Sequence, residues 1–256
     1  MVRRRAHSFQ VLLFFLASLM ATDAVAQESE VPNAPRVGVF PNEALEVKGE
    51  ERRFRLVVPQ ELDLEEPTPL MIAFHGMLLD SKDVMPAYTK LHELAERKQF
   101  IIAFPQALEA SWGIVPTKVR ADLAFFDALV RHLTATYRID RKRLYVVGMS
   151  NGGYFAHLVG RKRSNKIAAV VSHSGPLGVE AHFGIRSKRK FPVMIVHGEK
   201  DKVFPIAIAE NNRDRYREEG HPVEYVAVPN LGHSWAGKSN INNSIWEFLS
   251  ANPLKK

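Results

Sequence analysis

A serine between glycines follows an apolar run in residues 144–153, which read LYVVGMSNGG. Gly148 and Gly152 stand two residues before and two after Ser150. A sharp strand-to-helix turn holds a nucleophilic serine in a strained conformation, and side chains at the flanking positions would collide across that turn. A tight loop with an idle serine would use the same glycines, so the pattern needs partners before it has a function. Ser150 is therefore a candidate nucleophile.

A serine hydroxyl needs a base to accept its proton and a third group to orient that base. Asp201 comes shortly after the apolar run 193–196, and His233 follows the run 223–228. They occur in the order acid, then histidine, downstream of Ser150. Glu199 is the rival carboxylate, but the acid in such sites usually lies a few residues past its strand, which favours Asp201. The sequence thus predicts Ser150, His233 and Asp201 as nucleophile, base and orienting acid.

Other histidines have weaker claims on this chemistry. His75 and His197 each end an apolar run and precede a glycine, so an imidazole at either place can bond to neighbouring backbone groups. His75 is kept as a candidate contact for substrate. No HxxxH or HExxH spacing indicates a metal site, and the chain has no cysteine. We expect neither a metal nor another cofactor.

An acyl-transfer site also needs donors for the oxyanion of its tetrahedral intermediate. One should be the backbone N–H of Asn151, because the first N–H groups of a helix have no partner within it. The second is expected from the loop after residues 70–74, where His75 and a glycine precede Met77. We assign it to the backbone N–H of Met77.

These residues must be held by an alternation of strands and helices. The predicted strands are 53–58, 70–74, 100–104, 143–147, 167–172, 193–196 and 223–228, several of them continuous apolar runs. The predicted helices are 84–97, 121–137, one beginning at 154, 207–219 and 242–250. This order predicts an α/β fold: a doubly wound, mostly parallel sheet with helices on both faces. Ligands of such sheets bind beyond the carboxyl ends of the strands, where the candidate residues stand.

With these motifs the chain resembles the α/β-hydrolase superfamily, in particular the secreted esterases grouped with polyhydroxybutyrate depolymerases, feruloyl esterases and acetylxylan esterases. The resemblance rests on FHG at 74–76, on the segment 137–153, on VHGEKDKV at 196–203 and on LGHSW at 231–235. It implies the same roles for Ser150, His233 and Asp201. Family members often carry cysteines near the site and a glycine, cysteine or polar residue after the HG, whereas this chain has no cysteine and has Met77 there. The depolymerases that attack solid polymer often add linker and binding modules, which this sequence does not show. The expected substrate is therefore a soluble ester or oligomer rather than an insoluble polymer.

The substrate pocket is less defined by the sequence. Trp112 and Trp235 are candidates to line it, and packing in the core is the equal alternative for each, since a tryptophan buries much apolar area anywhere. Acyl and alcohol pockets are expected from the loops 105–118 and 177–190. The expected partner is a small or oligomeric ester, with polysaccharide-linked feruloyl or acetyl groups and hydroxyalkanoate oligomers as the candidate classes.

The first residues have the order of a secretory signal: Arg3 to Arg5, an apolar core at 11–20 and the small-x-small site ending at Ala26. We expect cleavage there, no stable membrane anchor, and a secreted or periplasmic protein. A retained anchor is the alternative. Residues 27–48, rich in Pro, Asn and Glu, are expected to be a flexible lead-in to a catalytic domain at 49–256.

The net charge is +7, with basic runs at 161–163 and 186–190. No interleaved aromatic pattern or known motif accompanies them, so nucleic acid is not an expected partner, although an acidic polysaccharide or anionic surface would be attracted. Two alternatives to an esterase remain open: a peptidase of the same fold, and a non-catalytic exported binding protein.

Overall fold

The structure is a computed structural model and describes residues 34–77, 81–178 and 187–255. The expected signal segment and its cleavage site at Ala26 lie outside the described residues. The strands are β1 (Gly38–Val47), β2 (Glu50–Val58), β3 (Thr68–Phe74), β4 (Ile101–Pro105), β5 (Ile139–Met149), β6 (Ala169–His173), β7 (Val193–Gly198) and β8 (Val223–Val228). The helices are α1 (Ser81–Thr89), α2 (Leu91–Lys98), α3 (Pro116–Thr136), α4 (Asn151–Lys162), α6 (Ile206–Glu218) and α7 (Ile241–Ser250), with a 3₁₀ turn η1 (Gly237–Ser239).

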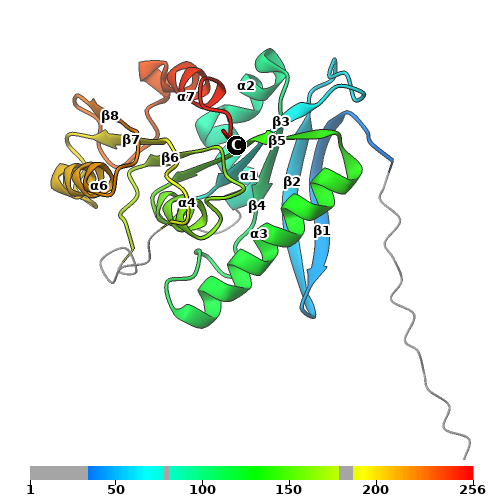
Figure 1. Ribbon diagram of the computed structural model, residues 1–256, viewed down its shortest axis with the longest axis horizontal. Helices are drawn as coiled ribbons and strands as arrows, with labels where there is room; N and C mark the ends of the chain where they lie inside the picture. The colour runs from blue at the N-terminus through cyan, green and yellow to red at the C-terminus, as the bar shows by residue number, and fades with distance from the viewer. Residues whose placement is uncertain (1–33, 78–80, 179–186, 256) are drawn as a thin grey trace, which may run out of the picture. The chain divides into compact units, whose positions relative to one another are not determined.

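The eight strands form one sheet in the order β1-β2-β4-β3-β5-β6-β7-β8 (Figure 1). β1 and β2 pair antiparallel with each other, and β2 pairs antiparallel with β4. The remaining neighbours, from β4 through to β8, are parallel. The predicted α/β class with a mostly parallel sheet is confirmed, and each of the seven predicted strands corresponds to one strand from β2 to β8.

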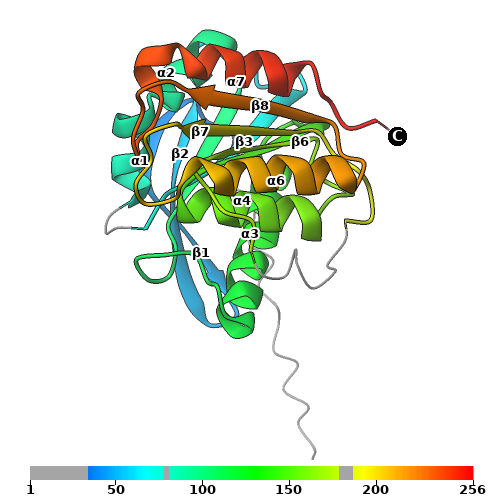
Figure 2. The same ribbon diagram turned by 90° about the vertical axis from the view of Figure 1, so that its left-hand side faces the viewer.

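Helices cover both faces of the sheet, with α3, α4 and α6 on one side and α2 and α7 on the other (Figure 2). Each face has its own apolar core. Side chains of α3, α4 and α6 such as Phe126, Phe155 and Tyr216 pack in the first, and those of α2 and α7 such as Leu94 and Ile245 pack in the second. The central strands are buried on both faces, which explains why their sequences are continuous apolar runs.

Two sequence predictions are corrected. The flexible lead-in at 27–48 is wrong for its last part, because residues 38–47 form β1, a strand paired with β2 along its length. Apolar and polar residues alternate only weakly along β1, and Pro41 and Asn42 lie at a bulge in the strand. The sequence of this segment therefore lacks the pattern that predicts a strand. The single helix predicted at 84–97 is two helices, since the backbone turns left-handed at Lys90 with φ 58°.

The carboxyl ends of the parallel strands meet at one edge of the sheet, as the fold requires for a binding site. Ser150 directly follows β5, His173 ends β6, Asp201 follows β7 and His233 follows β8. Among the residues that the structure describes, every helix is too short or too polar to cross a lipid bilayer.

Candidate active site

Ser150 occupies the turn between β5 and α4 in a strained conformation. Its φ and ψ are 55° and −120°, outside the regions that ordinary residues prefer. Its N–H donates to the carbonyl of His173 at 2.9 Å, and its own carbonyl accepts the first helical bond, from the N–H of Tyr154 at 3.0 Å. The turn is therefore fixed from both sides, with the serine at its tip.

The glycines around Ser150 are required by close backbone contacts. A Cβ on Gly148 would collide with the carbonyl of Gly152, and a Cβ on Gly152 would collide with the carbonyls of Phe74 and His75 at the end of β3. β3 and α4 can approach each other this closely only because Gly152 has no side chain. The expectation that the glycines relieve a collision across the turn agrees with this geometry.

A hydrogen-bonded chain joins the three predicted residues. Ser150 Oγ lies 2.9 Å from His233 Nε2, and His233 Nδ1 lies 2.7 Å from Asp201 Oδ2. Ionised carboxylates only accept, so His233 carries its proton on Nδ1 and Nε2 is free to accept from the serine hydroxyl. The side chain of His233 is partly exposed, whereas the carboxylate of Asp201 is fully buried.

Asp201 remains a carboxylate in this buried position. Burial alone would raise its pKa, but hydrogen bonds from the N–H of Phe204, from His233 and from the N–H of Val203 hold the pKa below its usual value. Both backbone bonds measure 2.9 Å and end on Oδ1, which leaves Oδ2 for His233. His197 Nε2 lies 3.4 Å from the same Oδ2 and donates to the carbonyl of Phe204 at 2.7 Å. An ionised Asp201 keeps His233 in one tautomer and one orientation.

His75 has the structural role that the sequence favoured. Its Nε2 accepts from the N–H of Ala107 at 3.0 Å, so Nδ1 carries the proton and donates to the carbonyl of Gly76 at 2.6 Å. Burial lowers the pKa of His75 to about 4, which keeps the ring neutral. The imidazole ties the loop after β3 to the loop after β4 and is not open to a substrate.

Trp112 packs in the core, the alternative weighed for it. Its side chain is 1% exposed and stacks on Phe155 with ring centroids 4.6 Å apart. The indole N–H donates to the carbonyl of His75 at 3.0 Å. Trp112 therefore supports the loop after β3 and helix α4 through these contacts, and its burial leaves no surface for a ligand.

The Asn151 side chain has a role that sequence reasoning missed. Its Oδ1 accepts from the backbone N–H of Trp112 at 2.7 Å and its Nδ2 donates to the carbonyl of the same residue at 3.2 Å. The side-chain amide thus binds both backbone groups of Trp112, in the loop after β4. The position of Asn151 directly after Ser150 predicts a role for its backbone N–H as an oxyanion donor, but it does not predict these side-chain bonds.

The loop that carries His233 is held from two sides by residues that the sequence did not single out for this. The N–H of Trp235 donates to the hydroxyl of Tyr88 in α1 at 2.6 Å, and the N–H of Ala236 donates to Nε2 of His173 at 3.1 Å. Trp235 also stacks on the His173 ring at 4.7 Å and is 6% exposed. Burial lowers the pKa of His173 to about 3.

Met77 lies in the loop after β3, and its side chain is 61% exposed. The preceding Gly76 is adjacent to the turn of Ser150, because a Cβ on Gly76 would lie 3.4 Å from the Cβ of Ser150. The predicted oxyanion donors, Met77 and Asn151, thus belong to two segments close to the serine, the loop after β3 and the start of α4. Within the described residues, no group of three or more His, Cys, Asp or Glu side chains is arranged to hold a metal ion.

The arrangement can remove a proton from Ser150 and return it to a leaving group, which is the chemistry of acyl transfer. The family described as the dienelactone hydrolase family matches residues 97–252, a range that holds Ser150, Asp201 and His233. The chain belongs to the dienelactone hydrolase family. The recognised α/β-hydrolase resemblance is thereby confirmed.

Several relatives of this dienelactone hydrolase family member are named esterases. A bifunctional acetylxylan esterase/xylanase of Neocallimastix patriciarum is 30% identical over 161 residues, which are 62% of this chain and 23% of that protein. Feruloyl esterase D of Neurospora crassa is 26% identical over 218 residues, 80% of this chain and 72% of that protein. The chain thus spans about a quarter of the first relative and most of the second.

Solved structures confirm the fold. A CE1 ferulic acid esterase from Anaeromyces mucronatus superposes with a TM-score of 0.63 at 17% identity, over 90% of this chain and 95% of that one. A thermostable esterase superposes with a TM-score of 0.66 at 22% identity, over 83% of this chain and 63% of that one. At these identities the likeness concerns the α/β-hydrolase fold.

Proposed function

We propose that the protein is a serine carboxylic ester hydrolase, with Ser150 as nucleophile, His233 as general base and acid, and Asp201 as the acid that orients His233. The observation that carries this proposal is the continuous hydrogen-bonded chain from Ser150 Oγ through His233 to Asp201 Oδ2, with distances of 2.9 and 2.7 Å. Membership of a hydrolase family and the esterase names of its relatives support it.

The reaction proceeds by an acyl-enzyme. His233 Nε2 takes the hydroxyl proton as Ser150 Oγ attacks the ester carbonyl, and the resulting imidazolium is stabilised by the Asp201 carboxylate. His233 then protonates the departing alcohol as the carbonyl re-forms. Water repeats the sequence on the acyl-serine, with His233 again as base, and releases the carboxylic acid. No cofactor takes part in these steps.

The oxyanion of each tetrahedral intermediate is bound by the backbone N–H groups of Asn151 and Met77. Asn151 is the first residue of α4, whose leading N–H groups have no acceptor within the helix and carry partial positive charge. Its side chain is engaged by Trp112, so the backbone is held rigid for this role. Donors fixed in advance lose little free energy to reorganisation when charge develops.

The substrates we propose are esters of small acids on carbohydrate, with feruloyl favoured over acetyl, and hydroxyalkanoate oligomers as the second class. Exposed apolar side chains lie on loops that follow the carboxyl ends of β3, β4 and β7. Met77 adjoins Gly76, Ile114 lies two residues from Trp112, and the N–H of Val203 bonds to Asp201. They would bury apolar surface of an aromatic acyl group more than that of an acetyl group.

The test compares methyl ferulate, acetylated xylan, a hydroxybutyrate trimer and p-nitrophenyl acetate as substrates of the purified protein. Ser150→Ala and His233→Ala should each lower kcat by roughly 10⁴ or more, and Asp201→Asn by roughly 10⁴. Ser250→Ala, on the exposed end of α7, is the matched control and should retain full turnover. Near-normal hydrolysis by both Ser150→Ala and His233→Ala, with an intact circular dichroism spectrum, would overturn the proposal.

We also propose that the protein is exported and that the mature chain begins at Gln27, on the strength of the basic start, apolar core and Ala24-Val25-Ala26 site of the sequence. An intact mass measured on protein recovered from outside the cytoplasm tests this. A mass that includes residues 1–26 would contradict cleavage.

A further inference from the structure

A groove lies at the end of the sheet remote from Ser150. It consists of two adjoining pockets of about 370 and 470 Å³ that share Arg141, Asn165 and Leu254. We call it the basic groove, and its lining is Asp127, Val130, Arg131, Thr134, Ile139, Arg141, Lys142, Leu144, Asn165, Lys166, Lys188, Arg189, Leu254 and Lys255. Ile139 begins β5, whereas Ser150 follows the last residue of that strand, so the groove is separate from the proposed active site.

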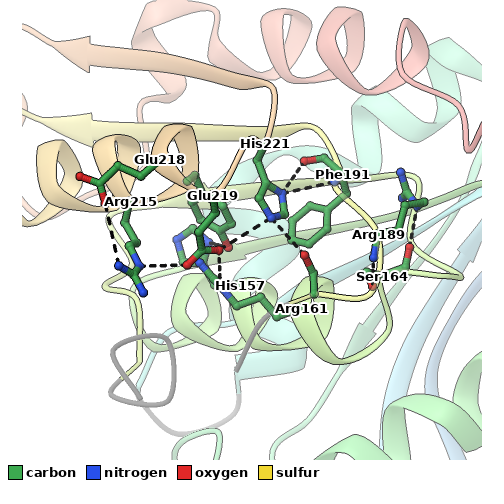
Figure 3. A network of polar contacts seen from close by, with 11 residues as sticks. His157, Arg161, Ser164, Arg189, Phe191, Arg215, Glu218, Glu219 and His221 are labelled. Atoms are coloured by element: carbon green, nitrogen blue, oxygen red, sulfur yellow. Dashed lines mark hydrogen bonds and ion pairs between the residues drawn. The ribbon is translucent and has the colours of Figure 1, made fainter. Parts of the chain in front are cut away.

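The walls of the basic groove are held by specific bonds. The N–H of Leu254 donates to the carbonyl of Lys142 at 2.7 Å, which fixes the C-terminal segment against the start of β5. Arg189 donates from Nε to the carbonyl of Ser164 at 2.8 Å and from its backbone to the Ser164 hydroxyl at 3.2 Å (Figure 3). Arg189 thereby fastens the segment that carries Lys188 to the turn after α4. The groove is a preformed feature of the fold.

Positive charge in the basic groove lacks counter-charge. Seven lining side chains are cationic and one, Asp127, is anionic. Asp127 is already engaged: Arg163 binds it with bonds of 2.9 and 2.6 Å, and Lys166 lies 3.4 Å away. Burial would raise the pKa of Asp127, but these two cations hold it below the usual value.

Six of the cationic side chains have no ion-pair partner within the part of the chain that the structure describes: Arg131, Arg141, Lys142, Lys188, Arg189 and Lys255. Like charges gathered in a concave surface create a focused positive potential that attracts a polyanion. The groove therefore has charge complementarity for an extended ligand with several negative groups.

The floor of the groove identifies the kind of polyanion. Val130, Ile139, Leu144 and Leu254 supply aliphatic surface, and no aromatic side chain lines the groove. Single-stranded nucleic acids are bound by stacking on aromatic rings, which are absent from this lining. A membrane surface is bound by inserted apolar side chains, and none of the large exposed ones of the described residues lies in this groove.

We propose that the basic groove binds an acidic oligosaccharide, a chain of sugar units that carry uronate carboxylates. The aliphatic floor contacts the C–H faces of the sugar rings, while Arg141, Arg131 and Lys188 pair with the carboxylates, guanidinium groups being suited to bidentate carboxylate contacts. Binding here leaves Ser150 accessible and does not depend on the proposed hydrolase activity.

Isothermal titration with a hexagalacturonate as probe tests the proposal. Wild-type protein should bind it in low salt, with affinity that falls at least tenfold between 50 and 500 mM NaCl, and should not bind neutral cellohexaose. The double variant Arg141→Glu/Lys188→Glu, with both changes at exposed positions, should bind hexagalacturonate at least tenfold more weakly. Lys98→Glu/Arg217→Glu, exposed on α2 and α6, makes the same change of net charge away from the groove and should bind within threefold of wild type.

The outcomes separate this site from the active site and from other ligands. Turnover of p-nitrophenyl acetate should be equal in wild type and both double variants, whatever that turnover is. Equal loss of binding in the two double variants, or equal binding of the acidic and neutral hexasaccharides, would overturn the proposal. So would tighter binding of a twelve-nucleotide single-stranded DNA or of vesicles rich in phosphatidylglycerol than of hexagalacturonate.

Discussion

His173 combines a positioning role with a marked preference for the neutral state. Its Nε2 accepts from the N–H of Ala236, and Trp235 stacks on its ring, so the imidazole supports the loop that carries His233. A protonated ring could not accept that bond, since both nitrogens of the cation are donors. The buried position, which lowers its pKa to about 3, is therefore consistent with its hydrogen bonds.

The pH dependence of stability follows from this shift. The unfolded chain binds a proton on His173 near its ordinary pKa of 6.5, whereas the folded chain does so only near about 3. Protonation thus favours unfolding, and the stability contribution is complete above pH 6.5 and is lost as the pH falls toward 3. His173→Gln, which retains an acceptor for Ala236, should reduce the loss of unfolding free energy between pH 7.5 and 5 by about 2 kcal/mol. Urea denaturation at the two pH values measures this, and identical losses in wild type and variant would contradict it.

The close contact between β3 and α4 fixes the position of the helix that begins directly after Ser150. The α-carbon of Gly152 faces the carbonyls of Phe74 and His75 without space for a methyl group. Displacing α4 would also move Asn151, and with it the amide that binds Trp112. The geometry of nucleophile, oxyanion donor and loop is consequently set by one backbone contact.

Gly152→Ala should destabilise the fold by about 1–3 kcal/mol, because overpacking forces backbone shifts. It should lower kcat for p-nitrophenyl acetate more than it raises KM, since the helix start and the serine move together. Gly220→Ala is the control for a position with free space around its α-carbon, and its cost comes from a φ of 78° alone. Thermal denaturation with steady-state kinetics measures both variants, and a fully active, stable Gly152→Ala would show that α4 tolerates the shift.

The elements that the sequence predicts correctly are mainly those in which burial determines the arrangement of apolar residues. The strands β3, β4, β6 and β7 are buried at every residue because helices cover both faces of the sheet, and the residues at the strand ends follow from parallel topology. The order of Ser150, Asp201 and His233 could be predicted for the same reason. β1 lies at the edge of the sheet, where weak alternation of apolar and polar residues is tolerated, and such a pattern does not distinguish a strand from a flexible segment. The break at Lys90 is a left-handed backbone conformation, which the apolar periodicity of residues 84–97 does not reveal.

The contacts that support the site were less accessible to sequence reasoning. The bond from Trp235 to Tyr88 joins residues 147 positions apart, and that from Ala236 to His173 joins residues 63 apart. Such pairs depend on the packing of loops in three dimensions. Whether Trp112 lines the pocket or packs in the core likewise depends on a three-dimensional contact, its stacking on Phe155.

A buried ion pair links three segments that are distant in the sequence. Arg52 of β2 lies 2.8 Å from Asp122 of α3, and the other oxygen of Asp122 accepts from the N–H of Gly113 at 2.8 Å. Both charged side chains are nearly inaccessible to solvent, and the guanidinium also lies over the Phe125 ring at 4.2 Å. The pair thus connects the antiparallel edge of the sheet to the loop that Asn151 binds.

Asp122→Ala should lower the free energy of unfolding by about 3–5 kcal/mol, because it leaves the Arg52 charge buried without a partner. Glu109→Ala removes the exposed partner of Lys118 and should change stability by less than about 1 kcal/mol. Replacing both members of the buried pair, as in Arg52→Met/Asp122→Leu, should recover much of the loss. Chemical denaturation of the three variants provides the measurement, and equal costs for Asp122→Ala and Glu109→Ala would contradict a special role for the buried pair.

The length of β5 sets the distance between the basic groove and Ser150. Its eleven residues run from the basic groove at Ile139 to the turn of Ser150. At about 3.3 Å per residue the two ends are roughly 35 Å apart. A polymer held at one end of the strand would raise the local concentration of any ester attached several sugar units away, while the ester nearest the held units would be out of reach. The length of this strand would then set the spacing along a polymer at which the molecule works.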